Sequence, residues 1–297
     1  MKQSQITAAL LLALAATAPK PTNAADAPLA PNAILQFEFP ELPESYYAKQ
    51  KGEKALAMLT AQLPENYSSE AKFPLFVYLQ GGNGGRSDSA AFARSVVGPR
   101  DFIAVRLPLF KTDAGSSLLI PEGLLSAELA KRAKALEFIT ANDFSVTARA
   151  YQTMLSKLFD AVPNATRERS AIGGFSNGAH CVSALLILKD DFLLDHFTSF
   201  YFLDGGQPLL IHPDALKDPR AHRSRYLLLR GDPAKDDLAA RQLIEPMILA
   251  FDKRAQADGL DFTSILMTGH GHTQPPEYLQ LIGAWARGEA LPNVGKE

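Results

Sequence analysis

The chain has 297 residues, enough for one large α/β domain or two small ones with a substantial buried core. Hydrophobic residues make up 46% and charged residues 21%, which argues against a disordered chain, and the formal net charge of −2 predicts no nucleic-acid partner. The single cysteine, Cys181, excludes an internal disulfide and is expected to be a small buried side chain inside a helix.

The first 25 residues are expected to form a signal peptide. Lys2 precedes an apolar stretch, Ile6 to Ala16, that is too short to span a bilayer as a helix, and the polar segment Pro19 to Asn23 leads to small residues at Ala24 and Ala25. Cleavage there would leave residues 26–297 as one domain, with 28 basic and 32 acidic residues. We predict a secreted or periplasmic protein without stable membrane insertion after cleavage; the alternative is an uncleaved anchor or a disordered tail.

Short apolar runs predict the strands of a sheet whose central strands are covered on both faces. These runs lie at 56–63, 74–80, 102–107, 170–172, 199–203, 226–229 and 262–267.

Helical patterns fall between the runs, at 142–162, 179–188, 234–257 and 275–287, and Pro246 is expected to kink or restart the third. This alternation predicts an α/β fold with a doubly wound, mostly parallel sheet flanked by helices. Residues 112–139 fit the alternation least well; they form either a cap or lid segment over the site or an ordinary crossover.

The segment Gly174-Phe175-Ser176-Asn177-Gly178 places a serine where an apolar run gives way to a helical one. Small residues around the serine let a strand and a helix approach at a sharp turn, which exposes the hydroxyl above the sheet edge. Ser176 is therefore the candidate nucleophile, and the N–H of Asn177 is a candidate donor to an oxyanion. The pattern by itself also suits a glycine-rich turn with an inert serine.

A serine nucleophile needs a base, and the loop Gly269-His270-Gly271-His272 after the last strand offers two histidines. We prefer His272, because Gly271 lets the backbone turn just before it, and expect His270 to line the pocket. His180 is predicted to be structural, and three further histidines are predicted to lie in solvated loops: His196, His212 and His222.

The acid that orients the histidine is less clearly marked. Asp236 is preferred, because it lies several residues beyond the 226–229 strand and has the reach. Asp232 in the turn and Asp237 at a helix start are alternatives, and a different arrangement would use Asp204 after the preceding strand.

The glycine-rich loop 81–85 after the 74–80 strand is the second candidate part of an oxyanion hole. Glycines there allow the backbone to approach a substrate carbonyl, and Gly82 is the preferred donor, with Asn83 next. A phosphate-binding loop is disfavoured, since the Gly-Lys-Ser/Thr ending is missing. No cofactor or metal site is predicted.

The order of these motifs resembles the α/β-hydrolase superfamily, and within it secreted esterases of the feruloyl-esterase and polyhydroxybutyrate-depolymerase kind. The resemblance runs from about Leu56 to the C-terminus and is carried by Leu63-Pro64-x-x-Tyr67, Phe73-Pro74-Leu75, Gly81-Gly82-x-Gly84-Gly85, Gly174-Phe175-Ser176-Asn177-Gly178, Gly231…Asp236 and Gly271-His272…Pro275-Pro276-Glu277-Tyr278. It implies Ser176 as nucleophile, His272 as base and an acid after the seventh strand. Gln80 stands where such proteins commonly have histidine, a change that backbone donors tolerate.

The sequence thus predicts an exported serine hydrolase that cleaves carboxylic esters, through a Ser176–His272–Asp236 triad, with a small-molecule or carbohydrate-linked ester as substrate. A peptidase or thioesterase using the same triad is one alternative. A non-catalytic binding protein on a hydrolase fold is the other.

Overall fold

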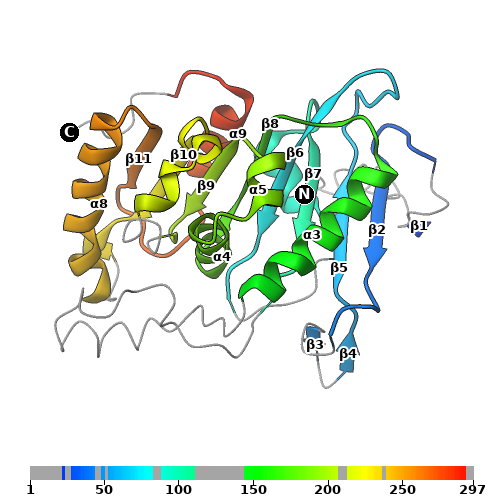
Figure 1. The fold of residues 1–297 in the computed structure, drawn as a ribbon, viewed down its shortest axis with the longest axis horizontal. Coiled ribbons are helices and arrows are strands. Elements are labelled where there is room, and N and C mark those ends of the chain that lie inside the picture. The colour runs from blue at the N-terminus through cyan, green and yellow to red at the C-terminus, as the bar shows by residue number, and fades with distance from the viewer. Residues whose placement is uncertain are drawn as a thin grey trace, which may run out of the picture.

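The computed structural model describes residues 22–23, 28–43, 48–50, 53–82, 88–110, 144–206, 213–235 and 239–291. Within them, nine strands form one sheet in the order β1-β2-β5-β7-β6-β8-β9-β10-β11, and β3 pairs with β4 (Figure 1). The strands are β1 Thr22–Asn23, β2 Ile34–Glu38, β3 Ala48–Gln50, β4 Glu53–Ala55, β5 Met58–Gln62, β6 Phe73–Leu79, β7 Ile103–Leu107, β8 Ala165–Phe175, β9 Ser199–Leu203, β10 Arg225–Gly231 and β11 Asp261–Met267.

Helices cover both faces of this sheet. They are α1 Ala91–Val97, α3 Phe144–Ala161, α4 Asn177–Ile187, α5 Asp191–His196, α7 Pro219–His222, α8 Ala239–Ala257 and α9 Pro276–Arg287, with 3₁₀ turns η3 Pro213–Lys217 and η4 Pro233–Lys235. Helices α3, α4, α5 and α8 contribute to one buried cluster, and α1 and α9 to the cluster on the opposite face. In Figure 1, α3 and α5 lie in front of the sheet, while α8 stands at its β11 edge.

The central part of the sheet is parallel. Strands β7, β6, β8, β9, β10 and β11 pair in parallel, whereas β5 is antiparallel to both β2 and β7. Every residue of β6 and of β9 is buried, as expected for strands covered on both faces. The predicted doubly wound, mostly parallel α/β sheet is therefore confirmed.

Each predicted strand is present, with β8 extended to eleven residues. The structure also contains elements that the sequence patterns did not predict: β2, the β3–β4 hairpin, and the short helices α1, α5 and α7. Pro246 lies inside α8, which is one continuous helix and not two. The possible lid at 112–139 lies outside the described residues. So does most of the predicted signal peptide, of which only the β1 residues are described; they pair in parallel with β2.

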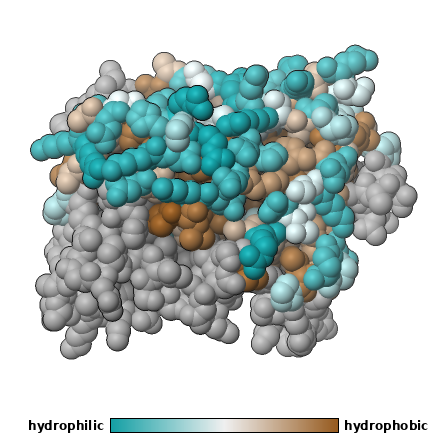
Figure 2. All heavy atoms as spheres, in the orientation of Figure 1, coloured by the Kyte–Doolittle hydropathy of each residue, from teal (hydrophilic) through white to brown (hydrophobic). Residues whose placement is uncertain are grey.

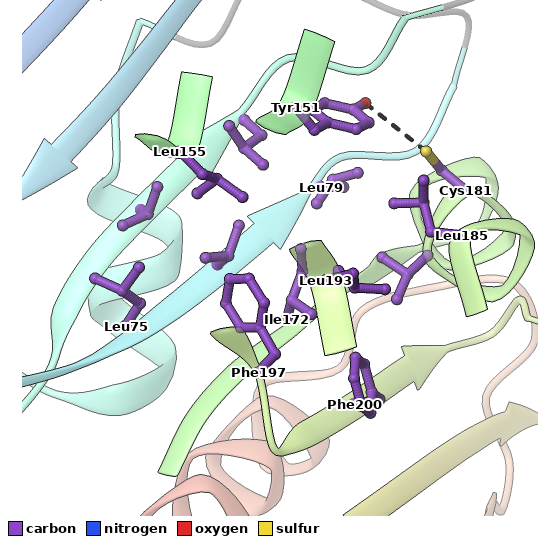
Figure 3. Close-up of a cluster of buried hydrophobic side chains, with 14 of the residues drawn as sticks. Leu75, Leu79, Tyr151, Leu155, Ile172, Cys181, Leu185, Leu193, Phe197 and Phe200 are labelled. Atoms are coloured by element: carbon purple, nitrogen blue, oxygen red, sulfur yellow. Dashed lines mark hydrogen bonds between the residues drawn. The ribbon is translucent and has the colours of Figure 1, made fainter. Parts of the chain in front are cut away.

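The core between the sheet and helices α3 to α5 is built from aliphatic and aromatic side chains, including Leu79, Ile172, Leu185 and Phe197 (Figure 3). Cys181 lies in this cluster, with Sγ 3.8 Å from the Tyr151 hydroxyl. Burial raises the pKa of the Cys181 thiol to about 12, so the thiol packs as a small neutral group, as predicted.

Hydrophilic residues cover much of the surface drawn in colour in Figure 2. The large hydrophobic residues exposed among the described ones, Leu29, Leu188 and Leu249, come from separate segments. No helix within the described residues has the length and apolar character needed to cross a bilayer.

Candidate active site

Ser176 stands at the sharp turn between β8 and α4, with φ 52° and ψ −118°. This left-handed backbone is costly for a residue with a side chain, and hydrogen bonds hold it: the Ser176 N–H donates to Leu203 O at 3.0 Å, and Ser176 O accepts from His180 N at 3.0 Å. The turn also needs glycine on either side. A Cβ on Gly174 or Gly178 would stand 2.4 or 2.2 Å from Leu79 O, closer than real Cβ atoms approach. The predicted strand-to-helix turn is therefore present.

His272 lies beside this serine, with Nε2 2.9 Å from Ser176 Oγ. Its ring stacks on Phe175, with centroids 4.7 Å apart and 27° between the planes. Two hydrogen bonds connect the loop that carries His272 to Asp232, the residue directly after β10. The Asp232 carboxylate accepts from Gly269 N at 2.8 Å, and the Asp232 N–H donates to His270 O at 2.7 Å. About a third of the His272 side chain (37%) is exposed, so solvent reaches the imidazole.

The carboxylate on the other side of His272 belongs to Asp204, directly after β9. Its Oδ2 accepts a hydrogen bond from His272 Nδ1, and its Oδ1 accepts from Gly231 N at 2.9 Å, while the side chain is fully buried. A proton held on Nδ1 leaves Nε2 of the neutral imidazole free to accept the Ser176 hydroxyl proton. The three side chains therefore form a continuous chain in the order Ser176, His272, Asp204.

This arrangement differs from the preferred choice of acid. Asp236 and Asp237 lie outside the described residues. The Asp232 carboxylate accepts hydrogen bonds from Ala234 N, in its own turn, and from Gly269 N, in the histidine loop. The partner of His272 Nδ1 is Asp204, the residue that the sequence offered as a different arrangement.

A sequence signal for Asp204 did exist in the two glycines that follow it. A Cβ on Gly205 would lie 2.4 Å from Ser176 O, so this position accepts only glycine because the turn after β9 packs against the nucleophile. A glycine pair directly after an acidic residue at a strand end thus marks the close approach.

The other histidines are occupied elsewhere. His270 Nε2 pairs with Glu277 Oε1 at 2.9 Å. His180 accepts the Gly206 N–H on Nδ1. His196 ends α5 and hydrogen-bonds Phe192 O, so it is not a loop residue as predicted, and the exposed His222 ends α7. His212 lies outside the described residues.

The two predicted oxyanion donors lie next to each other. Asn177 is the first residue of α4, in the turn whose N–H groups have no acceptor within the helix. Its side chain donates through Nδ2 to Gly82 O at 2.5 Å. A Cβ on Gly81 would stand 2.9 Å from Ser176 Cβ, so the Gly81–Gly82 backbone runs alongside the nucleophile. Asn83 lies outside the described residues.

Within the described part of the chain, no cluster of three or more histidine, cysteine, aspartate or glutamate side chains is arranged to hold a metal ion.

No protein-family profile and no curated protein matches this sequence. Many solved structures do match in fold. A thermostable esterase superimposes with a TM-score of 0.53 at 14% identity, over 86% of this chain and 62% of that one. The chain has the α/β-hydrolase fold.

A presumed dipeptidyl aminopeptidase IV from Bacteroides ovatus also superimposes, with a TM-score of 0.51 at 14% identity, over 87% of this chain and 36% of that one. The chain thus spans about a third of the length of the aminopeptidase and about three fifths of the length of the esterase. At such low identity, the likeness establishes the fold alone.

Proposed function

We propose that this protein is an exported serine hydrolase that cleaves carboxylic esters. The observation that carries the proposal is the 2.9 Å contact between Ser176 Oγ and His272 Nε2, backed by the buried Asp204 carboxylate on Nδ1. A hydroxyl on a strained turn, hydrogen-bonded to an imidazole that a carboxylate orients, is the arrangement that activates serine for attack on a carbonyl carbon.

In the proposed reaction, Ser176 Oγ attacks the ester carbonyl while its proton passes to His272 Nε2. The imidazolium that forms is stabilised by Asp204, which stays ionised. Collapse of the tetrahedral intermediate breaks the bond to the alcohol oxygen, which takes the proton from His272 and leaves an acyl group on Ser176. Water then repeats the sequence, with His272 as base, and releases the carboxylic acid.

The developing oxyanion would be held by the N–H groups of Asn177 and Gly82. The hydrogen bond from the Asn177 side chain to Gly82 O supports this pairing, because it ties the two donor segments together before substrate arrives. Donors fixed in advance need no reorganisation when the charge develops.

The proposed substrate is a small-molecule or carbohydrate-linked ester. Because the His272 imidazole is partly exposed to solvent, a substrate can reach it from solution. The esterase among the proteins of like fold supports an oxygen ester, whereas the aminopeptidase keeps amide cleavage as the alternative to be tested.

The test is hydrolysis of p-nitrophenyl esters of graded acyl length, with a p-nitroanilide and a thioester in parallel. We expect ester turnover that Ser176→Ala abolishes and that Ser95→Ala, which removes a hydroxyl from the exposed face of α1, leaves unchanged. A higher kcat/KM for the anilide would indicate a peptidase. No turnover of any of the three would indicate a binding protein on the hydrolase fold.

Export has its own test. N-terminal sequencing of protein recovered from outside the cytoplasm is expected to begin at Ala25 or Asp26, after cleavage of the signal peptide. Recovery of the intact N-terminus from the cytoplasm would contradict export and leave the hydrolase proposal standing.

A further inference from the structure

The turn that carries Asp204 has an unusual backbone. Asp204 has φ +49° and Gly206 has φ +84°, so both residues lie in the left-handed region. For aspartate this conformation is costly, and it persists only where the surroundings determine it. The orientation of the Asp204 carboxylate toward His272 therefore depends on whatever holds this turn.

One side chain outside the Ser176–His272–Asp204 chain holds it. The Gly206 N–H donates to Nδ1 of His180 at 3.1 Å. His180 lies one helical turn after Ser176 in α4, and its own N–H donates to Ser176 O. Gly205 makes a second contact between this turn and the nucleophile, because its Cα lies so close to Ser176 O that a Cβ would not fit. The turn at residues 204–206 is thus held against α4, the helix that follows the nucleophile Ser176.

This hydrogen bond requires an unprotonated Nδ1. The pKa of His180 is lowered to about 4, chiefly by burial; the nearby Asp204 opposes this shift and His272 adds to it. At neutral pH the ring is uncharged and accepts the Gly206 N–H, and it adds no positive charge beside Asp204.

We propose that His180 is a positioning residue: by accepting the Gly206 N–H, it fixes the Asp204–Gly206 turn so that the Asp204 carboxylate meets His272. This inference rests on the proposed function in so far as it concerns catalysis. It gives a role in the site to a histidine that has no contact with the reacting atoms.

The test compares three variants. His180→Ala removes the acceptor, whereas His180→Asn places its Oδ1 at the position of the histidine Nδ1. His180→Gln carries an amide of the same kind but places its oxygen elsewhere. For His180→Ala we expect kcat on a p-nitrophenyl ester to fall about 10- to 100-fold, with KM changing less than about threefold, because a misplaced carboxylate weakens transition-state stabilisation and not substrate binding. His180→Asn should stay within about threefold of the wild type, and His180→Gln should resemble His180→Ala. The exposed His222→Ala is the matched histidine control and should match the wild type.

A second readout separates positioning from simple packing. Displacement of the Asp204 carboxylate should weaken its hydrogen bond with His272 Nδ1 in His180→Ala but not in His180→Asn. The downfield proton resonance of the Asp204–His272 hydrogen bond should shift or broaden in the same variant, and this can be recorded without any substrate.

Two results would overturn the inference: a His180→Ala variant that matches the wild type in kcat and proton resonance, or a His180→Asn variant that loses as much kcat as His180→Ala. If His180→Ala does not fold, the comparison of His180→Asn with His180→Gln decides. If the wild type hydrolyses no ester, the proton resonance still tests the positioning role, so failure of the function and failure of this inference are distinguishable.

Discussion

Replacing Asp204 with asparagine keeps the shape of the side chain but removes its charge and one of its acceptors. In the wild type, Oδ1 accepts from Gly231 N and Oδ2 accepts from His272 Nδ1. The amide can accept only one of these bonds. If its oxygen serves Gly231, its NH₂ faces His272 Nδ1, and the imidazole must carry its proton on Nε2, where it can no longer accept the Ser176 proton.

The expected loss in kcat is about 10³- to 10⁴-fold, equivalent to ~4–5.5 kcal/mol of transition-state stabilisation. If the oxygen faces His272 instead, the buried Gly231 N–H is left without an acceptor, which costs about 1–3 kcal/mol of unfolding free energy. Steady-state kinetics on a p-nitrophenyl ester, with urea unfolding of the same samples, measures both quantities.

Asp236→Asn and Asp237→Asn are the matched controls, because each removes one aspartate charge from the region that the sequence favoured for the acid. Both should retain wild-type kcat. A thousandfold loss in Asp236→Asn, with Asp204→Asn close to wild type, would refute the assignment of the acid to Asp204.

Three further outcomes follow from the geometry. In ester assays, His272→Ala should lose at least about a thousandfold in kcat, whereas His270→Ala, which removes only the pair with Glu277, should lose less than about tenfold; the reverse ranking would exclude His272 as the base. In thermal unfolding, Gly178→Ala should lower the free energy of unfolding by about 1–3 kcal/mol or more, because its Cβ meets Leu79 O, and an unchanged midpoint would contradict the packing of the turn. Burial raises the pKa of Asp252 from 3.8 to about 6, so the folded chain holds this proton more tightly than the unfolded chain, and its ionisation destabilises the fold as pH rises through that window. Asp252→Asn should therefore raise the midpoint at pH 8 and change it far less at pH 4; equal changes at both would count against the shift.

The sequence predicts the middle of the sheet well because burial on both faces leaves a mark in the residues themselves. Every residue of strands β6 and β9 is buried, and apart from Ser199 these residues are apolar or aromatic. Strand β2 was not predicted, since it lies toward the edge and its burial alternates. Its pairing with β1 and β5 identifies it.

In the site, the preferred nucleophile and base, Ser176 and His272, do face each other, whereas the residue on His272 Nδ1 is Asp204 and not the preferred Asp236. Ser176 and His272 are marked by glycines that the turns require. An aspartate follows both β9 and β10, and the glycine pair after Asp204 identifies the acid only once it is known which turn packs against the nucleophile. The answer depends on β9 lying next to β8, the strand that ends at the nucleophile, so that the turn after β9 packs against Ser176.

The proposed hydrolysis depends on activation of the Ser176 hydroxyl as a nucleophile. The most direct measurement is peptide mapping by mass spectrometry after incubation with a fluorophosphonate, which reacts with serine hydroxyls that a neighbouring base activates. We predict one adduct, on the peptide containing Ser176; it should be absent in Ser176→Ala and should form more slowly in His272→Ala. Folded protein that forms no adduct, or forms it on another residue, would contradict the activation of Ser176.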